Sequence, residues 1–378
     1  MARKTDWYTN NLIYRLVFEN LKHRPVRTFL TAIFIGIQVT MILTLVGLSE
    51  GVTGDIKERS RGTGADIIIR PANSSALSFT GNFSVPEDKL LAEITKIPHI
   101  ALANGVLVES TGFLESITGI HLDEFNAMSG GFHYSEGSPA TTFQRPDDIL
   151  VDQEYADSKH LHLGSIVKIG QNWRVSGVVE SGKLSRIFAQ IGPVQEMFSD
   201  TGKVSTIYIK VDQPANIESV VADVRSKFEE FKVYPMKDYM DLISVDNVPL
   251  MKGFTKVVIG VAIIVGILVV LLTMYTAVLE RTREIGILKA LGASPSYIMG
   301  ILLREAFVLA VVGTIAGILM SYGTQALMRA FAPTYTQVIV MNWWPITGGI
   351  SLGAALIGAI YPGLKAAHQD AIEALAYD

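Results

Sequence analysis

The sequence predicts an α-helical membrane protein with four transmembrane helices plus a large α+β extracytoplasmic domain inserted between helices 1 and 2. Three observations predict this fold class. First, the chain of 378 residues is 49% hydrophobic with a mean hydropathy of +0.34, which is too apolar for an ordinary water-soluble protein. Second, four long stretches carry no charged residue. Third, residues 51–253, between the first two of these stretches, have the mixed composition of a water-soluble α+β domain.

The four apolar stretches are each long enough to cross about 30 Å of hydrocarbon as a helix. The charge-free stretches are residues 29–49, 257–279, 306–328 and roughly 338–364, and they predict transmembrane helices over residues 29–50, 254–279, 300–328 and 342–364. The centres of these spans contain no Asp, Glu, Lys, Arg or His, the residue types that line ion pathways and proton relays. A proton-driven pump is therefore disfavoured. Because four helices cannot enclose a conduit, we also expect the chain to form oligomers.

The distribution of Lys and Arg predicts the orientation, because cytoplasmic loops carry the excess of these residues. Basic residues are frequent before the first span and between the second and third spans: Arg3, Lys4, Arg15, Lys22, Arg24, Arg27, Arg281, Arg283, Lys289 and Arg304. Between the third and fourth spans the sequence has a single basic residue, Arg329. Both termini, including the tail 365–378, are thus predicted to be cytoplasmic. Residues 51–253 and the short loop 329–341 are predicted to lie outside.

The N-terminal residues 1–28 predict a cytoplasmic amphipathic helix on the inner membrane surface. Between Trp7 and His23, apolar residues recur near helical spacing beside charged residues. Pro25 marks the junction with the first span. The apolar run that follows is too long for the core of a signal peptide and is not followed by a small-residue cleavage site, so we expect an uncleaved anchor.

Patterns of apolar residues predict the elements of the exterior domain. Ile207, Ile209 and Val211 alternate with more polar neighbours, as in a half-buried strand, and residues 217–231 follow helical spacing. Further strands are predicted at 65–70, 104–109, 113–121, 166–170 and 174–179, and further helices at 86–97 and 153–161. The loose Gly/Ser/Pro stretch 125–146 either separates two subdomains or forms a mobile loop.

Small residues at four-residue spacing support close helix packing in the third and fourth spans. They are Gly313 and Gly317 in the third span, and Gly349 and Gly353 in the fourth. Packing within one chain is the favoured interpretation of these glycines. A contact between two chains of a dimer is the alternative.

The predicted cytoplasmic loop 280–299 begins with Glu-Arg-Thr-Arg-Glu-Ile-Gly-Ile-Leu-Lys-Ala-Leu-Gly-Ala over residues 280–293. This pattern predicts a short amphipathic helix with Ile285 and Leu288 on one face, and Gly292 is well placed to end it. Such a helix would fit a groove on a cytoplasmic partner. A solvated connecting loop is the alternative, and these residues by themselves favour neither.

Residues 280–293 closely resemble the signature of the FtsX/MacB permease superfamily, roughly E-R-x-x-E-I-G-x-L-K-A-[LIV]-G-A, and agree with it at every defined position. Residues 362–375 resemble the closing motif of the family, P-A-x-x-A-A-x-x-D-P-I-E-A-L, from which Gly363 and Ala371 depart. Ala371 replaces a proline that would fix a turn. Residues 148–211 are similar to the family's extracytoplasmic domain. The resemblance is closest to the MacB/LolC/LolE branch, without a fused ATPase.

The resemblance implies an assembly of two permease chains and two ABC ATPases, in which closure of the ATPases is transmitted through the spans to the exterior domain. The family calls this mechanotransmission. ATP and Mg would be bound by the separate ATPase subunit, so this chain would be no enzyme and would hold no cofactor. The ATPase-coupling residues carried over from the signature are Glu280, Arg283, Glu284, Gly286, Leu288, Lys289 and Gly292.

The same resemblance implies a multi-pass protein of the bacterial cytoplasmic (inner) membrane, paired with a second copy or a homologue as a dimer. If the cell has an outer membrane, a periplasmic adaptor and an outer-membrane channel would be further partners. Nucleic acid is not an expected partner, because the net charge is −4.

Three weaker signals are interpreted as ordinary surface features. Residues 177–184 are one residue short of a phosphate-binding loop, carry leucine where Ser or Thr should hold magnesium, and are predicted to lie outside. His160 and His162 have no apparent third metal ligand. Asp147 and Asp148 are interpreted as solvated turn residues, since nothing pairs them with a nucleophile or base. We therefore expect no catalytic residues and no metal site.

The leading functional hypothesis is a permease for export or extraction of a hydrophobic drug, peptide or lipoprotein. The alternative is an FtsX-like transmembrane regulator of an extracellular cell-wall hydrolase. A membrane-anchored receptor without an ATPase is a third hypothesis, which leaves the cytoplasmic signature unexplained. The size of the exterior domain fits the MacB and LolC branch better than the smaller FtsX domain. The substrate and the choice between homodimer and heterodimer stay open.

Overall fold

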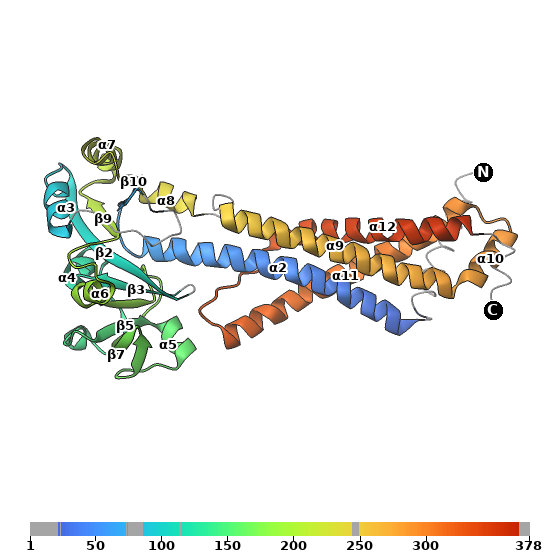
Figure 1. The fold of residues 1–378 in the computed structure, drawn as a ribbon, viewed down its shortest axis with the longest axis horizontal. Coiled ribbons are helices and arrows are strands. Elements are labelled where there is room, and N and C mark those ends of the chain that lie inside the picture. Colours follow the sequence, from blue (N-terminus) through green and yellow to red (C-terminus); the bar gives the residue numbers. More distant parts are fainter. Residues whose placement is uncertain are drawn as a thin grey trace. The chain divides into compact units, whose positions relative to one another are not determined.

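The computed structural model describes residue 22 and residues 24–72, 74, 86–112, 115–243 and 249–369. The chain divides into two compact units (Figure 1). Unit 1 consists of Met1–Ser49, Gly253–Leu327 and Gln337–Asp378, and unit 2 of Glu50–Lys252 and Met328–Thr336. The amphipathic helix predicted between Trp7 and His23 lies outside the described residues, and so do residues 370–378 of the tail.

Four long helices are apolar and long enough to cross a membrane, which confirms the predicted fold class. They are α2 (Pro25–Arg61), α9 (Pro249–Glu280), α11 (Pro295–Phe331) and α12 (Trp344–His368), and Figure 1 shows them side by side. Each is longer than the span expected from the sequence, because backbone hydrogen bonding continues beyond the charge-free stretch that hydrocarbon requires. Helix α2 begins in unit 1, and its residues 50–61 belong to unit 2.

Glycines bring α2 and α11 into close contact inside unit 1. A Cβ atom on Gly317 would lie 2.6 Å from the carbonyl oxygen of Gly36 and 2.6 Å from Val39 Cβ. A Cβ atom on Gly313 would lie 2.6 Å from Ile35 Cβ. At the same crossing, the Thr40 hydroxyl donates to the Gly317 carbonyl at 3.0 Å. Such small residues let helix backbones approach each other where lipid offers no hydrophobic driving force.

The two glycines of α12 that were predicted to support packing, Gly349 and Gly353, have different surroundings from Gly313 and Gly317. A Cβ atom on Gly349 or Gly353 would meet no described atom within 4 Å. The structure thus places Gly313 and Gly317 against α2 of the same chain, whereas Gly349 and Gly353 have space around them.

This difference predicts opposite outcomes for two matched substitutions. Gly317→Ala is expected to destabilise unit 1 by about 1–3 kcal/mol, because the added methyl group overpacks the α2–α11 contact. Gly353→Ala should leave the stability of the isolated chain unchanged or slightly raised. Thermal unfolding of the purified chain in detergent measures both, and equal melting temperatures for the two variants would contradict the packing argument.

Unit 2 is built on a ten-stranded mixed sheet with the order β10-β1-β9-β2-β3-β8-β5-β7-β4, and β6 pairs with β7. The strands are β1 (Ile67–Arg70), β2 (Ile100–Gly112), β3 (Glu115–Ile120), β4 (Tyr134–Glu136), β5 (Asp148–Asp152), β6 (Ile166–Ile169), β7 (Gln171–Val179), β8 (Ile187–Gln190), β9 (Thr206–Val211) and β10 (Lys232–Pro235). The long strand β2 joins the two halves of the sheet, because it pairs with β9 over residues 100–106 and with β3 over residues 107–112.

Short helices cover the sheet. They are α3 (Glu87–Ile94), α4 (Leu122–Ser129), α5 (Gln153–Lys159), α6 (Ile191–Phe198), α7 (Ile217–Lys227) and α8 (Met236–Leu242), with 3₁₀ turns at Pro139–Thr141 and Pro214–Asn216. One apolar cluster holds Ile207 and Ile209, and a second holds Tyr208 of the same strand. Strand β9 was expected to be half-buried. That expectation is wrong for Tyr208, which is 4% exposed because both faces of the strand are covered.

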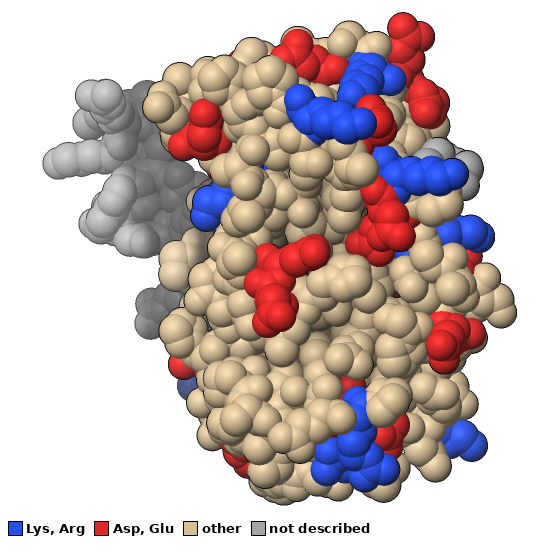
Figure 2. Space-filling view, turned by 90° about the vertical axis from the view of Figure 1, so that its left-hand side faces the viewer, with Lys and Arg blue, Asp and Glu red and all other residues tan. Residues whose placement is uncertain are grey.

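The structure differs from two other expectations for unit 2. The stretch 125–146 contains part of α4 and also β4, which pairs with β7 in the common sheet, so it is ordered and continuous with the domain. Asp148 is fully buried rather than solvated, and it accepts hydrogen bonds from Arg174 at 2.7–2.8 Å. On the face shown in Figure 2, Lys and Arg side chains stand in small groups among acidic and uncharged residues.

Candidate coupling site

The segment that carries the signature folds as a separate short helix between two spans. Helix α9 ends at Glu280 and α10 (Thr282–Ala290) begins two residues later. The hydroxyl of Thr282 donates to the carbonyl oxygen of Val278 at 3.2 Å, which ties the first turn of α10 to the end of α9. Helix α10 therefore follows directly from α9.

The end of α10 is a Schellman motif, which needs a left-handed residue. The N–H of Gly292 donates to the Lys289 carbonyl at 2.9 Å, and the N–H of Ala293 donates to the Leu288 carbonyl at 3.0 Å. Gly292 has φ = +93°, a conformation that glycine adopts without a steric cost. The turn into α11 depends on this residue.

Gly292→Ala is accordingly expected to weaken the end of α10 by about 1 kcal/mol. Amide hydrogen exchange in residues 288–293 should become roughly fivefold faster, since that factor corresponds to about 1 kcal/mol. Gly300→Ala is a suitable control, because Gly300 lies inside α11 and a Cβ atom there would approach Arg304 no closer than 3.8 Å. Equal exchange in both variants would show that α10 does not need the left-handed residue.

One side of α10 is buried and the other is open. Ile285 is 8% exposed and packs with a cluster that includes Ile298 of α11 and Ala366 of α12. Ile287 is 46% exposed and Leu291, just past the helix end, is 80% exposed. Arg283 and Glu284 are also exposed. We call Arg283, Glu284, Ile287 and Leu291 the α10 surface.

The α10 surface differs from the face that helical spacing predicted. Ile285 and Leu288 were expected to face a partner, yet Ile285 is buried and Leu288 is partly buried. The helix has apolar residues on two sides, and periodicity cannot tell which side packs on the rest of the chain. Leu291 lies next to the predicted Gly292 and was missed. The sequence signal that could have identified Leu291 is the presence of a leucine at the end of a short charged helix.

The predicted coupling residues do not form one cluster. Arg283 and Glu284 belong to the α10 surface, whereas Gly286 is buried inside unit 1. Lys289 turns toward the end of α12, where its ammonium donates to the carbonyl oxygen of Gln369 at 2.5 Å. Of the remaining members, Glu280 forms ion pairs, Leu288 is partly buried, and Gly292 makes the turn described above.

Glu280 belongs to a charged cluster that joins three helices at the same end of unit 1 as α10. Its carboxylate lies 3.0 Å from Arg24 and 3.2 Å from Arg27 of α2. Arg27 also lies 3.3 Å from Glu305 of α11, and Glu305 lies 3.5 Å from Arg281. Glu305 is only 1% exposed, so its charge depends on these two guanidinium groups.

Glu305 is a second residue that the sequence analysis missed. It directly precedes the charge-free part of the third span, and a carboxylate in that position usually has a partner inside the bundle. Its two partners come from α2 and from the α9–α10 junction, which are far apart in the sequence. A movement of α10 relative to α11 would therefore change the ion pairs that hold α2.

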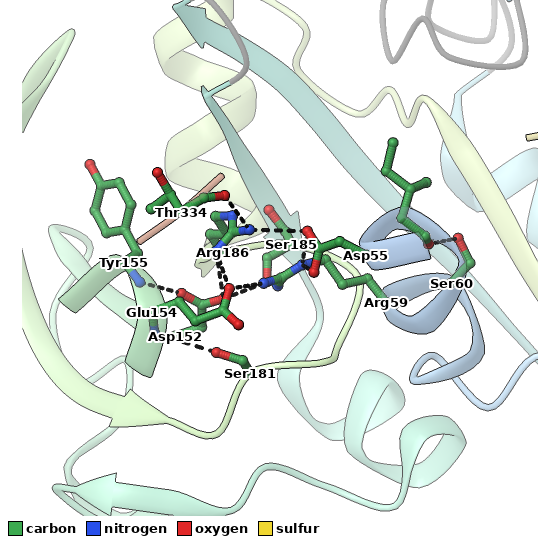
Figure 3. A network of polar contacts seen from close by, with 11 residues as sticks. Asp55, Arg59, Ser60, Asp152, Glu154, Tyr155, Ser181, Ser185, Arg186 and Thr334 are labelled. Carbon is green, nitrogen blue, oxygen red and sulfur yellow. Dashed lines mark hydrogen bonds and ion pairs between the residues drawn. The ribbon is translucent and has the colours of Figure 1, made fainter. Parts of the chain in front are cut away.

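Unit 2 contains a second charged cluster, shown in Figure 3. Arg59, 6% exposed by its side chain, lies 2.8 Å from Asp152, 3.1 Å from Glu154 and 3.0 Å from Asp55. Arg186 pairs with Asp55 at 3.0 Å and with Glu154. Burial raises the pKa of Asp152, and the positive charge of Arg59 opposes that shift. The cluster connects the last turns of α2 with β5, α5 and the segment before β8.

The same cluster also holds the segment between α11 and α12. The guanidinium of Arg186 donates to the carbonyl oxygen of Thr334 at 2.9 Å. The short loop predicted at 329–341 therefore contributes residues 328–336 to unit 2. Nothing in the composition of this loop predicts that contact, since it is made by a backbone carbonyl group.

Comparisons with known proteins identify the family of this chain. Residues 28–227, more than half of the chain, match the family model of the MacB-like periplasmic core domain. Residues 256–371 match the FtsX-like permease C-terminal family model. These two regions include all four long helices and most of the sheet.

Among similar proteins, an uncharacterized ABC transporter permease of Methanocaldococcus jannaschii is 25% identical, with coverage of 96% of this chain and 97% of that protein. The uncharacterized ABC transporter permease YknZ of Bacillus subtilis is 26% identical, with coverage of 89% and 95%. The macrolide export ATP-binding/permease protein MacB of Escherichia coli is 23% identical over 96% of this chain, which spans 60% of MacB.

Solved structures similar to this chain include the periplasmic region of MacB from Actinobacillus actinomycetemcomitans. The match covers 48% of this chain and 94% of that one, at 15% identity and a TM-score of 0.37. The extracellular domain of the transporter YknZ from Gram-positive bacteria matches 45% of this chain and 98% of that one, at 16% identity and a TM-score of 0.33.

Proposed function

Since the chain belongs to the MacB/FtsX type of ABC transporter permease, we propose that it works as the membrane subunit of a transporter whose ATP hydrolysis takes place in a separate ATPase. ATP and Mg would be bound by that partner. The proposed complex holds a second permease chain, either a copy or a homologue, beside this one. Its place is the cytoplasmic membrane, with α10 and both termini on the cytoplasmic side.

The α10 surface is the observation that carries this proposal. It exposes Ile287 and Leu291 on a short helix whose opposite side is anchored on α11 and α12. An apolar pair flanked by exposed charges fits a groove on a folded partner protein, where a few buried apolar side chains supply most of the affinity. We assign that groove to the ATPase.

The charged cluster around Glu305 supports a route by which movement of the ATPase would reach unit 2. An ATPase that displaces α10 would pull on Arg281, and through Glu305 on Arg27 of α2. Helix α2 ends in unit 2, where Arg59 belongs to the second charged cluster. The movement would thus reach the exterior domain along a continuous helix, with no charged pathway through the membrane.

Export or extraction is the proposed task, with a hydrophobic drug, peptide or lipoprotein as cargo. The similarity to MacB of Escherichia coli, a macrolide export protein, supports this class. A regulator of a cell-wall hydrolase would use the same coupling, and the experiment below distinguishes the two by the proteins that accompany the chain.

The proposal is tested by affinity purification of the tagged full-length chain from its own membranes in mild detergent. We expect an ABC ATPase to be recovered, and we expect ATP hydrolysis to require both proteins. A co-purifying adaptor or cargo would support export, and a co-purifying hydrolase would support regulation. Recovery of the intact chain without any ATPase, after chemical cross-linking in the membrane, would refute the transporter assignment.

A further inference from the structure

A cavity of about 270 Å³ in unit 2 is lined by three basic side chains. Arg61 is the last residue of α2, His133 lies in the segment before β4, and Lys183 lies in the loop after β7. Ser129 and Ser181 also line this cavity, and Glu180 is the one acidic residue of the lining. The loop that supplies Lys183 is the one that fell one residue short of a phosphate-binding motif.

The walls of the cavity are held together by backbone contacts. A Cβ atom on Gly62 would overlap the carbonyl oxygen of Gly182, so the turn after α2 and the loop after β7 touch directly. The N–H of Leu184 donates to the Arg59 carbonyl at 2.9 Å across the same junction. The backbone walls of the cavity are therefore in contact before any ligand arrives.

The basic groups of the cavity retain capacity to bind a ligand. Lys183 donates to the carbonyl oxygen of Ser129 at 2.7 Å, and its ammonium has two further donors. No described carboxylate pairs with Lys183 or with Arg61. Burial lowers the pKa of Lys183, and an anion beside it would oppose that shift. The hydroxyl of Ser129 is buried and has no hydrogen-bond partner among the described residues.

We propose that this cavity binds a phosphate ester that carries an amine, of which phosphoethanolamine is the simplest example. Arg61 and Lys183 would donate to the phosphate oxygens, as guanidinium and ammonium groups do in phosphate sites. Glu180 would accept hydrogen bonds from the amine. The volume fits such a group, whereas drug-sized ligands need about 300–1,000 Å³.

The amine-bearing phosphate ester has two sources, the headgroup of a phospholipid and a soluble phosphate ester. Both present the same chemistry to Arg61, Lys183 and Glu180, so one titration tests the site and a second distinguishes the sources. The assignment goes beyond the proposed transport function, because it needs neither the ATPase nor the α10 surface.

The test is a ³¹P NMR titration of O-phosphoethanolamine with the purified full-length chain in detergent. Wild type is expected to bind saturably, and Arg61→Gln and Lys183→Gln are each expected to weaken binding about tenfold, since a charge-assisted hydrogen bond is lost. Lys168→Gln is the matched control, because Lys168 is exposed on β6 and lies outside the cavity. Arg61 is exposed, so its substitution should leave the fold intact, which hydrogen exchange of unit 2 verifies.

Repeating the titration in nanodiscs that contain phosphatidylethanolamine identifies the source. Competition by the lipid would assign the site to a headgroup, and unchanged affinity for the soluble probe would assign it to a free phosphate ester. Either result supports the site. Failure of wild type to bind saturably, or equal binding by wild type, Arg61→Gln and Lys183→Gln, would overturn the proposal.

Discussion

Leu291→Asp is expected to remove the ATPase from the purified complex while leaving the permease folded. Leu291 is 80% exposed, so its substitution costs little inside this chain. In the complex, the carboxylate would be buried against an apolar groove without a partner. Loss of a central apolar anchor typically costs about 2 kcal/mol or more, which raises the dissociation constant roughly thirtyfold. Quantifying the ATPase recovered per permease, at several ATPase concentrations, measures this change.

Ile166→Asp is the matched control for Leu291→Asp. Ile166 is 68% exposed on β6 of unit 2, so it tests whether any new surface carboxylate disturbs the complex. Ile287→Asp should weaken binding in the same direction as Leu291→Asp. Leu288→Asp is less informative, because Leu288 is partly buried and its substitution would also disturb α10. Full ATPase recovery with Leu291→Asp would show that docking uses another surface.

Arg59→Met is expected to destabilise unit 2 by about 3–5 kcal/mol, the usual cost of removing one partner from a buried ion pair. The substitution keeps an unbranched side chain of similar length but leaves Asp152, which is 1% exposed, without its 2.8 Å contact. The remaining cation, Arg186, is 3.8 Å from Asp152 and is shared with Asp55 and Glu154. Amide hydrogen exchange in β5 and β8 of the full-length chain should rise accordingly.

Lys159→Met serves as the control for Arg59→Met. It also removes a cation from an ion pair, with Glu115 at 3.5 Å, but both side chains are about half exposed. Little change in exchange is expected there, because exposed pairs contribute little to stability. If Arg59→Met proved as stable as Lys159→Met, the desolvation cost of burying Arg59 would offset its attraction to the three carboxylates of the cluster.

The sequence predicted the membrane spans because lipid imposes a simple requirement, a helix-length run without charge. It could not predict where the helices end, since α2 continues through charged residues to Arg61 and is stabilised there by unit 2. Strand β9 was also found by its alternation. The burial of Tyr208 was not predictable, because it depends on a second layer that lies elsewhere in the chain.

The sequence predicted which segment forms the candidate site, but it did not predict which side chains of that segment are exposed. Signature resemblance located α10 and its terminal Gly292. The orientation of the helix, with Ile285 inward and Leu291 outward, depends on how α11 and α12 pack. Glu305 was missed for a related reason, since its partners Arg27 and Arg281 are brought near it by the folding of three helices.

The membership of residues 328–336 in unit 2 determines how this unit can be studied in isolation. A protein cut at residues 50 and 252 would lack this peptide, and Arg186 would lose the acceptor that Thr334 provides. Supplying the peptide as a fusion, or adding it in trans, should restore hydrogen-exchange protection around β8. An epitope tag inserted next to Thr334 would disturb the hydrogen bond from Arg186 to the Thr334 carbonyl oxygen, so tags are better placed elsewhere. Unit 2 is a discontinuous domain made of two chain segments. Its shorter segment begins about 75 residues after the longer one ends.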